Sequence, residues 1–425
     1  MSAQGAVSAS GMRSAFGRKI GIIHSIYKPE TRGGAEVAVE SIARGLKNQG
    51  DDVFVISVGR KNQKEEIDGL RIYRIKPFNL FNFLDINYQP AILRFFWHLL
   101  DMANGAQTWR AYRILSQEKP DIVFTHNLKG LGYHLSWLLK IMKIKQVQTI
   151  HDMQLIHPSG LLKDREKINV LVKIYASFNK ILFRPVELVV FPSEYIKSVY
   201  EKHGFFKRAE KMVLGNPVLK VPTLPEGGQV ATPDGADRGG GRGEFQILFL
   251  GQIESYKGIF ELIEAVKGLE SLPAQAGDFV LNIVGDGSAL TEAKIRAQEA
   301  LPDDSFKVKI RFWGRLSQRE LEDKIWPSAD LLVNPSQVPE SFGLVVIEAF
   351  SQGVPVLVSN NGALPALVKE GQTGFIVKNN NWREKIQWCL NHQAELEKMR
   401  GNCLKEASKY GLEDYLNKLK RFAKI

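Results

Sequence analysis

Short apolar runs alternate with amphipathic stretches of helical spacing along most of the chain. The first run, residues 19–24, leads through a polar loop into apolar positions spaced as in a helix up to Gly50, and a second run follows at 53–58. Such alternation predicts parallel β-strands joined by crossover helices. Runs of the same kind recur at 121–126, 148–152, 187–191, 245–250, 280–284, 309–313, 331–333 and 354–358. The chain is therefore expected to be an α/β protein.

One stretch interrupts the alternation and divides the chain. Residues 222–243 are rich in Gly, Pro, Asp and Arg without periodicity, as in a flexible linker or surface insertion. The first eighteen residues are rich in Ser, Ala and Gly and lack a long apolar core, so we expect neither a signal peptide nor a membrane span there. The predicted organisation is a disordered tail at 1–18, a first Rossmann-like domain at 19–217, a flexible linker at 218–244 and a second Rossmann-like domain at 245–407.

Composition agrees with a globular chain. A sequence of 425 residues, 44% hydrophobic and 24% charged, is long enough for two or three domains. No stretch reaches eighteen apolar residues without a charge, so we expect no transmembrane helix. Cys389 and Cys403 lie in helical sequence and are interpreted as buried thiols in a reducing compartment, with no role in a disulfide or a metal site. These features predict a cytoplasmic protein.

Charge is unevenly placed along the chain. Residues 1–216 hold 32 Lys and Arg against 19 Asp and Glu, a net charge of +13. Residues 217–425 hold 25 against 27, a net charge of −2. A basic first half indicates an anionic partner such as a phospholipid surface, a lipid diphosphate or a nucleic acid. Because no zinc-finger, helix-turn-helix or RNA-binding signature is present, we expect no nucleic-acid partner.

Two stretches of the first half each leave two interpretations open. Residues 77–115 carry nine aromatic residues and predict two amphipathic helices, whose aromatic faces either belong to the core or form a surface toward an acceptor or a membrane. The segment 161–184 predicts a third helix, which either packs inward with a basic outer face or lies on an anionic membrane. Its basic residues are Lys173, Lys180 and Arg184, and its apolar face is expected to contain Ile168, Leu171, Tyr175, Phe178 and Leu182.

Polar side chains follow two of the predicted strands. His126 and Asn127 come directly after one apolar run, and His151 and Asp152 come after the next. The carboxyl ends of strands in open α/β sheets are where ligands bind, so these four residues are candidates for a binding site. The alternative is that each histidine is a structural residue at its strand end.

A pair of glycines opens the first predicted helix. Gly33 and Gly34 follow the first strand and its polar loop, and the resulting strand, glycine loop and helix can bring backbone amides close to a phosphate. An ordinary strand-to-helix turn would also explain them. The loop is not a G-x-G-x-x-G fingerprint, so a dinucleotide cofactor is not expected.

Two glutamates eight residues apart mark the stretch 326–358. Glu340 lies in a loop after a short buried strand, and Glu348 lies inside the apolar-rich helix that follows, which Gly353 ends. If the loop folds over this helix, both carboxylates face one crevice beside a helix N-terminus. Carboxylates accept hydrogen bonds from hydroxyls and helix amides bind phosphate, so the pair suits a polyhydroxyl ligand with an anionic group. The alternative is two solvated acids.

The stretch around Glu340 and Glu348 resembles the E-x7-E region of the retaining glycosyltransferases of family 4, which have the GT-B fold. The resemblance covers the chain from about Lys19 onward, because matching motifs recur in the expected order. It implies two Rossmann-like, doubly wound domains that face each other across a cleft, with a terminal helix at 408–425 crossing back to the first domain. It also implies that Glu348 binds the ribose hydroxyls, that Glu340 contacts the sugar and that the backbone amides of Phe342, Gly343 and Leu344 line the sugar and phosphate site.

Other motifs of the family align with this sequence. The Gly-Gly-Ala-Glu loop at 33–36 resembles the family's first-domain loop toward the donor phosphates, and His151-Asp152 resembles its histidine-acid pair, with His151 contacting the transferred sugar. Lys257 matches the lysine that binds the donor diphosphate, whereas Gln252 replaces the family's arginine and removes a charge and a bidentate fork. Gly285 matches a glycine turn near the donor. A glutamate that is common in the family's later G-G-x-P-E motif is Ala366 here.

The resemblance implies a retaining transfer of a sugar from a nucleoside-diphosphate sugar to a hydroxyl, with Glu340, His151 and Lys257 as catalytic residues. Together with the basic first half it indicates a lipid-linked or cell-surface glycan as acceptor, polysaccharide biosynthesis as the process and a peripheral position on the inner face of the plasma membrane. His126, Asn127 and Asp152 are expected on the acceptor side. No metal or cofactor is expected. The alternatives are another GT-B enzyme, such as a nucleotide-sugar epimerase or a phosphorylase, and a non-catalytic homologue that binds sugar or nucleotide.

Overall fold

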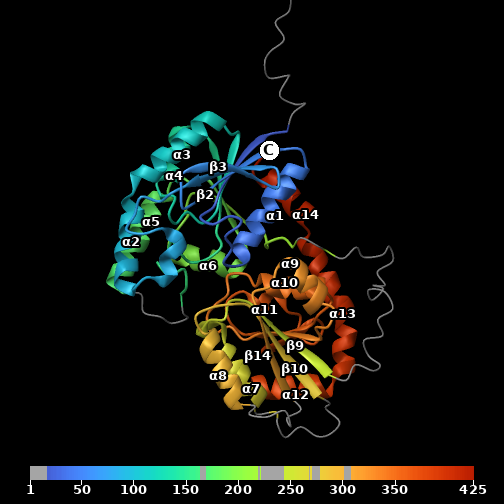
Figure 1. Ribbon diagram of the computed structural model, residues 1–425. Helices are drawn as coiled ribbons and strands as arrows, with labels where there is room; N and C mark the ends of the chain where they lie inside the picture. The colour runs from blue at the N-terminus through green and yellow to red at the C-terminus, as the bar shows by residue number, and fades with distance from the viewer. Residues whose placement is uncertain are drawn as a thin grey trace, which may run out of the picture. The chain divides into compact units, whose positions relative to one another are not determined.

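The structure is a computed structural model, and it describes residues 17–162, 169–218, 221, 244–267, 269, 278–300 and 308–425. These residues form two compact units (Figure 1). Unit 1 contains 17–161, 169–214 and 415–425, and unit 2 contains Leu162 and the described residues of 215–414. Each unit is a mostly parallel sheet flanked by helices, so the predicted α/β class with two Rossmann-like units is confirmed. Most of the predicted tail 1–18 and linker 218–244 lies outside the described residues.

Unit 1 has an eight-stranded sheet in the order β3-β4-β2-β1-β5-β6-β7-β8. Every neighbouring pair is parallel except β3 with β4. Its strands are β1 (Lys19–Ile23), β2 (Asp52–Val58), β3 (Gln63–Ile67), β4 (Leu70–Ile75), β5 (Ile122–Thr125), β6 (Lys145–Thr149), β7 (Leu188–Phe191) and β8 (Glu210–Val213). Its helices are α1 (Gly34–Asn48), the 3-10 helix η2 (Phe83–Tyr88), α2 (Ala91–Ala103), α3 (Gly105–Glu118), α4 (Leu135–Ile141), α5 (Val170–Leu182), α6 (Glu194–Lys202) and most of α14 (Leu412–Phe422).

The strand β3 is an element that the apolar pattern did not predict. Its sequence, Gln-Lys-Glu-Glu-Ile, is mostly charged and exposed, and it lies at the antiparallel edge of the sheet. Charged side chains protect an edge strand from pairing with other chains, so such a strand lacks the apolar run by which buried strands are recognised.

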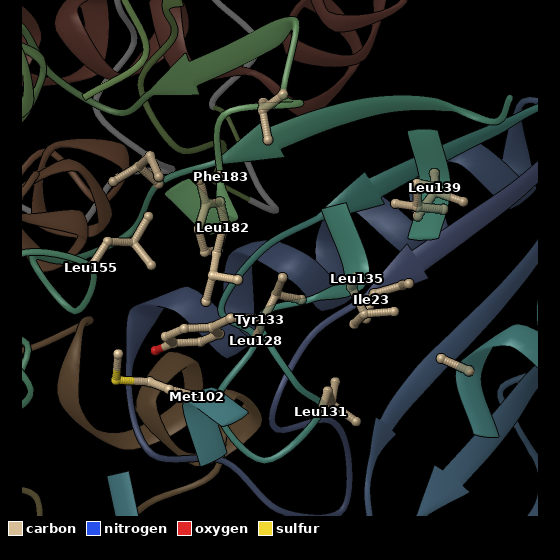
Figure 2. Packing of buried hydrophobic residues seen from close by; sticks show 14 of the residues in the cluster. Ile23, Met102, Leu128, Leu131, Tyr133, Leu135, Leu139, Leu155, Leu182 and Phe183 are labelled. Carbon is tan, nitrogen blue, oxygen red and sulfur yellow. The ribbon is translucent and has the colours of Figure 1, made fainter. Parts of the chain in front are cut away.

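The order of the strands determines which face of the sheet each helix covers. The connection from β1 to β2 runs in one direction along the sheet, whereas the connections from β4 through β5 and β6 to β7 run in the opposite direction. Because crossovers between parallel strands are right-handed, α1 covers one face and α2 to α5 cover the other, as Figure 1 shows. The core beneath the second group joins distant segments (Figure 2): Met102 of α2 lies near Tyr133 and Leu128. Leu182, at the end of α5, and the next residue, Phe183, belong to the same cluster.

Unit 2 has a six-stranded, all-parallel sheet in the order β11-β10-β9-β12-β13-β14. Its strands are β9 (Glu244–Leu250), β10 (Asp278–Val284), β11 (Val308–Gly314), β12 (Leu331–Asn334), β13 (Val356–Ser359) and β14 (Gly374–Val377). Its helices are the 3-10 helix η3 (Ser255–Lys257), α7 (Ile259–Lys267), α8 (Leu290–Ala300), α9 (Gln318–Glu320), the π-helix η5 (Leu321–Ile325), α10 (Leu344–Ser351), α11 (Leu364–Leu367), α12 (Trp382–Asn391), α13 (Gln393–Ala407) and the 3-10 helix η6 (Ser408–Tyr410).

The last helices contain both cysteines and lead to the end of the chain. Cys389 and Cys403 are free and buried, as predicted for structural thiols. The last eleven residues, 415–425, belong to unit 1, where the Lys420 ammonium lies 2.6 Å from the Asp51 carboxylate.

The aromatic stretch does form two helices, α2 and α3, but most of its aromatic side chains are not core. Trp97 is fully buried, whereas Tyr88, Phe96 and Trp109 are 85%, 49% and 58% exposed. In α5 the predicted apolar face is likewise only partly buried, because Tyr175 and Leu182 are in the core while Leu171 and Phe178 are exposed. Ile168 lies outside the described residues. For these helices the interpretation as core faces is therefore wrong at most positions.

Candidate functional site

Three strands of unit 1 each deliver a histidine at their carboxyl ends. His24 follows β1, His126 follows β5 and His151 lies just beyond β6. Nδ1 of His126 lies 2.9 Å from Nε2 of His151, and the two rings are stacked with centroids 5.1 Å apart. His24 lies edge-on to both rings at 5.9 and 6.1 Å. The structure therefore brings the two predicted histidines together and adds His24, which carries the same signal of a polar residue directly after a buried strand.

Burial keeps this histidine pair neutral. Burial and the nearby His24 lower the pKa of His151 to about 3, and burial lowers the pKa of His126 well below its ordinary value. A neutral imidazole has one donor and one acceptor nitrogen, so the pair shares a single N–H in its hydrogen bond. Nε2 of His126 and Nδ1 of His151 have no hydrogen-bond partner among the described residues. The pair therefore leaves one donor and one acceptor nitrogen buried at this sheet edge and unsatisfied by any described residue.

Glu36 connects the glycine loop to the histidines. Its carboxylate accepts a hydrogen bond from the Gly33 amide at 2.8 Å and lies 3.7 Å from Nε2 of His24. Burial disfavours the charge, but the interaction with His24 and the bond from Gly33 lower the pKa of Glu36 below its ordinary value. Gly34 is the first residue of α1. The predicted loop glycines are therefore held beside His24 by an ionised glutamate.

Asn127 and Asp152 also meet at this sheet edge. The Asn127 side-chain amide donates to the Asp152 carboxylate at 3.1 Å, and the same carboxylate accepts from the backbone amide of Gln154 at 2.7 Å. Burial raises the pKa of Asp152, and the charge of Lys129 opposes that rise. Lys129 donates to the carbonyl of Pro158 at 2.8 Å. The four candidates from the two strand ends thus form one polar cluster in unit 1.

In unit 2 the candidate lysine and the first candidate glutamate form an ion pair. Nζ of Lys257 lies 2.5 Å from Oε1 of Glu340, although the two residues are 83 positions apart. The loops that carry them are locked together, because the amide of Gln337 donates to the carbonyl of Tyr256 at 2.8 Å. Gly258 has φ +79°, and a Cβ there would lie 2.0 Å from the carbonyl oxygen of Pro335, so only glycine allows this approach.

The pair is mostly shielded from solvent. The side chains of Lys257 and Glu340 are 25% and 18% exposed. Burial disfavours the charged lysine, but the charge and hydrogen bond of Glu340 outweigh it and raise the pKa of Lys257 above its ordinary value. Lys257 is therefore a permanent cation at neutral pH, placed beside the carboxylate for which the family resemblance implies a sugar contact.

Glu348, the second glutamate, has a different environment. It lies in α10, where burial raises the pKa of its carboxyl to about 7. No residue in the described part of the chain donates a hydrogen bond to this carboxylate. A half-buried carboxylate without a donor is suited to receive hydroxyl groups from a ligand.

The start of α10 supplies backbone donors close by in sequence. Gly343 caps the helix with φ +97°, and a Cβ there would lie 2.7 Å from Cδ2 of Leu364. Within the described residues, the amides of Gly343 and Leu344 have no backbone acceptor, as expected for the first turn of a helix. Phe342 is buried and its ring lies 5.7 Å from that of Tyr410. The three predicted residues therefore form a fixed helix entrance with amides that can bind an anion.

The two remaining candidates lie at the ends of β9 and β10. Gly285 has φ +141°, and a Cβ there would lie 1.8 Å from the carbonyl oxygen of Gly251, which makes glycine necessary for this close approach. Its amide donates to the carbonyl of Gly314 at 2.9 Å. The Gln252 side chain accepts a hydrogen bond from the Tyr256 hydroxyl at 3.1 Å. Tyr256 was not predicted as a site residue, and its contact shows that glutamine at 252 supports the loop of Lys257.

Among the residues that the structure describes, no group of three or more His, Cys, Asp or Glu side chains is arranged to hold a metal ion. The absence of a metal from the reaction stays a prediction.

Comparison with known proteins connects both units to one class of enzyme. Residues 237–409 match the family described as glycosyl transferases group 1, and residues 32–218 match glycosyltransferase family 4. A 42.6 kDa protein from the cps region of Klebsiella pneumoniae is 27% identical over 353 residues, which are 81% of this chain and 86% of that protein.

Solved structures show the same fold. Sucrose-phosphate synthase from Thermosynechococcus elongatus has a TM-score of 0.71 at 18% identity, with 96% of this chain and 98% of that chain covered. Anabaena HepE, in complex with UDP and glucose, has a TM-score of 0.66 at 17% identity, with 95% and 98% covered. The fold is therefore that of the GT-B glycosyltransferases. From these matches and the two-unit fold, the chain belongs to the glycosyl transferases of group 1, with a family 4 glycosyltransferase unit at its N-terminal side.

Proposed function

We propose that this protein transfers a sugar from a nucleoside-diphosphate sugar to a hydroxyl of a lipid-linked or cell-surface glycan, with retention at the anomeric carbon and without a metal ion. The observation that carries the proposal is the arrangement in unit 2 of a shielded lysine cation on Glu340, a carboxylate without a donor at Glu348 and a helix entrance with unpaired amides. A nucleotide sugar has the complementary groups, namely an anionic diphosphate and vicinal hydroxyls.

Each residue then has a defined role. Glu348 accepts hydrogen bonds from the ribose hydroxyls, and Lys257 with the amides at Phe342, Gly343 and Leu344 stabilises the charge of the departing diphosphate. Glu340 contacts the transferred sugar. Gly33 and Gly34, at the start of α1, and Gly285 serve the donor through their backbone, and Gln252 supports the lysine loop.

The acceptor side is proposed in unit 1. His151 contacts the transferred sugar as a neutral imidazole, and His126, Asn127 and Asp152 orient it and the acceptor. During transfer the bond from the anomeric carbon to the phosphate oxygen breaks and the bond to the acceptor oxygen forms on the same face. Because the acceptor attacks the anomeric carbon directly, no covalent intermediate with a protein nucleophile is formed. The acceptor proton passes to the leaving diphosphate.

The substrate classes are supported by the relatives. HepE has been solved with UDP and with UDP-glucose, which favours a nucleotide-sugar donor of that kind for this chain. The relatives from the Klebsiella cps region favour a role in polysaccharide biosynthesis. The basic first half favours work at the inner face of the plasma membrane, where a lipid-linked acceptor is found.

The test separates this function from its rivals. Purified protein is incubated with a set of nucleotide sugars, with and without a membrane lipid extract, and products are followed by mass spectrometry. The proposal predicts a hexose-sized mass increase on an acceptor together with free nucleoside diphosphate. A nucleotide sugar of unchanged mass that elutes as an epimer on chromatography would indicate an epimerase. Phosphate-dependent release of sugar phosphate would indicate a phosphorylase, and binding without any product would indicate a non-catalytic homologue.

A further inference from the structure

Exposed apolar side chains are concentrated on one group of helices. Among the described residues, twenty large hydrophobic side chains are exposed; eighteen lie between residues 78 and 181 and two lie in unit 2. Fifteen of the eighteen are on α2, α3, α4 and α5, and we call these fifteen side chains the apolar face. They are Ile92, Leu93, Phe95, Phe96, Leu99, Leu100, Trp109, Tyr112, Trp137, Ile141, Val170, Leu171, Ile174, Phe178 and Ile181.

The four helices cover the same face of the unit 1 sheet. Right-handed crossovers place them together, and Figure 1 shows them side by side, away from α1. Asn104 ends α2 and caps α3 by accepting a hydrogen bond from Ala106. The Trp137 indole of α4 donates to the carbonyl of Ile181 in α5 at 3.1 Å. The apolar face is therefore carried by one connected layer of helices.

The helices that carry this face are anchored in the core by other side chains. In α2, Trp97 is fully buried, stacks on Phe83 at 5.5 Å and donates to the carbonyl of Phe81 at 2.9 Å. Asp101 accepts the Gly130 amide at 3.0 Å. In α5 the buried stripe includes Tyr175, whose hydroxyl donates to the carbonyl of Gln154 at 2.7 Å. The outward apolar side chains are thus displayed by packed helices, so their exposure is a property of the surface.

Charge identifies the partner. The basic residues on these helices are Arg94, Arg110, Arg113, Lys140, Lys173 and Lys180. The only acidic residues on the same four helices, all of whose residues are described, are Asp101 and Glu118, and both are buried. On α5 the exposed apolar residues occupy one arc of the helix and Lys173 and Lys180 border it. On the four helices every exposed charged side chain is a cation, and of the six cations Lys140 pairs with Glu187, which lies outside the helices. A surface with apolar side chains beside such cations fits a partner with an apolar interior and an anionic boundary.

We propose that the apolar face is a membrane-docking surface, which inserts its aromatic and aliphatic side chains into the interfacial region of an anionic phospholipid bilayer while its Lys and Arg bind lipid phosphates. Within the described residues, no helix is both long and apolar enough to cross a bilayer, which leaves docking on one leaflet as the mode of contact. A second copy of the chain is the less suitable occupant, since an isologous contact would bring the same six cations against each other.

The docking proposal depends on the proposed function in one respect, namely that docking would bring unit 1 to an acceptor held in the bilayer. The structure links the surface to the acceptor cluster, because Asp101 of α2 holds Gly130 three residues after Asn127. Docking itself needs no nucleotide, so it can be measured separately from transfer.

The experiment is vesicle flotation of the full chain at low and high salt, with vesicles of phosphatidylcholine alone or with about one third phosphatidylglycerol. We expect binding to the anionic vesicles that weakens strongly with salt. The triple variant Arg94→Glu/Arg113→Glu/Lys173→Glu should bind the anionic vesicles at least about 100-fold more weakly, because each cation near an anionic leaflet contributes about a factor of five. The apolar variant Ile92→Ser/Phe96→Ser/Ile174→Ser should bind the anionic vesicles at least about tenfold more weakly than the wild type. The matched controls Ile295→Ser and Arg319→Glu, exposed in unit 2, should bind as the wild type does.

Opposite results overturn the proposal whether or not transfer activity is found. Folded wild-type protein that floats with neither vesicle, or equally with both, has no anionic-lipid surface. If the unit 2 controls lost as much vesicle binding as the unit 1 variants, the binding would be non-specific adsorption. A wild-type dimer that the apolar variant converts to a monomer would assign the face to a second copy. Failure of the transfer assay with intact vesicle binding would instead contradict the proposed function alone.

Discussion

The Lys257 ammonium and the Glu340 carboxylate lie 2.5 Å apart, so the cation proposed for the diphosphate and the carboxylate proposed for the sugar hold each other in place. Each charge orients the other in a shielded site, which keeps both side chains ordered before a ligand arrives. A bound diphosphate would compete with Glu340 for the lysine, and the released carboxylate would be available for sugar hydroxyls. In the proposed function the pair would therefore couple recognition of the two halves of the donor.

Lys257→Ala should reduce turnover far more than Gln252→Ala. Only the lysine brings a full charge to the leaving group, and removal of one such stabilising group typically costs about 100- to 1,000-fold in kcat. Gln252 acts through Tyr256, so its removal should cost about tenfold or less. Steady-state kinetics on both variants checks this, with Lys324→Ala, an exposed lysine of unit 2, as control.

The same position offers a second check. Gln252→Arg restores the charge that the family has there, so it should tighten donor binding. An arginine variant that is well folded but binds donor more weakly would show that the loop is built around the Gln252–Tyr256 contact, and the assigned role of this loop in diphosphate binding would then be wrong.

Nucleoside-diphosphate binding should strengthen as pH rises through about 7. Burial raises the pKa of Glu348 to about 7, and only the ionised carboxylate accepts from both ribose hydroxyls. Ionisation of one such group between pH 6 and 8 tightens binding about tenfold. Calorimetric titrations at both pH values should show this increment in the wild type and in Glu413→Gln, an exposed control, but not in Glu348→Gln.

Replacement of Glu348 tests in a second way whether this residue binds the nucleotide. Glu348→Ala should weaken nucleotide binding at pH 8 by about 100-fold or more, because it removes two charge-assisted bonds that contribute about 1.5–3 kcal/mol each. Unchanged affinity in a folded variant would remove Glu348 from the site.

Activity should survive chelation by EDTA. The reason is that Lys257 and the α10 amides already supply positive charge where a metal would otherwise act. The measurement is nucleoside-diphosphate release before and after EDTA treatment. Complete loss that Mg²⁺ or Mn²⁺ restores would assign the leaving-group charge to a metal.

Asp101 should make unit 1 less stable as pH rises. Burial raises its pKa to about 7, although the bonds from Gly130 oppose that rise. A carboxyl whose pKa is higher in the folded than in the unfolded state contributes its full stabilisation of the folded protein below its unfolded pKa of about 4. This contribution is lost as pH rises to the folded pKa of about 7. Asp101→Asn cannot ionise, so relative to wild type it should gain up to about 4 kcal/mol between pH 4 and 8. Urea denaturation of both proteins at several pH values tests this, and a pH-independent difference would contradict it.

The sequence was sufficient for the features that depend on local pattern. Buried strands appear as apolar runs, and the residues directly after them, such as His126 and His151, meet because carboxyl ends of parallel strands share one edge. Gly343 entered the predicted site only through the family resemblance. The structure adds the reason for glycine there, a backbone angle that only glycine adopts without strain.

Features that depend on which segments become neighbours were not readable. Lys257 meets Glu340 because β9 and β12 are adjacent in the sheet, which no local pattern states. Helical spacing gave the apolar arcs of α2 and α5 but not how much of each arc the core covers, so Trp97 at 0% exposure and Ile92 at 61% carry the same signal. The polar strand β3 had no apolar signal because it lies at an edge.

The central claim is that unit 2 binds the nucleoside diphosphate of a sugar donor and releases it on transfer. The most direct measurement is nucleoside-diphosphate release from the donor that the product screen identifies, with and without acceptor lipid. We predict release that depends on acceptor, falls at least about 100-fold in Lys257→Ala/Glu348→Ala and is unchanged in Lys324→Ala. A folded wild-type protein that releases no nucleoside diphosphate from any donor, or that loses no activity when Lys257 and Glu348 are both replaced, would contradict the account.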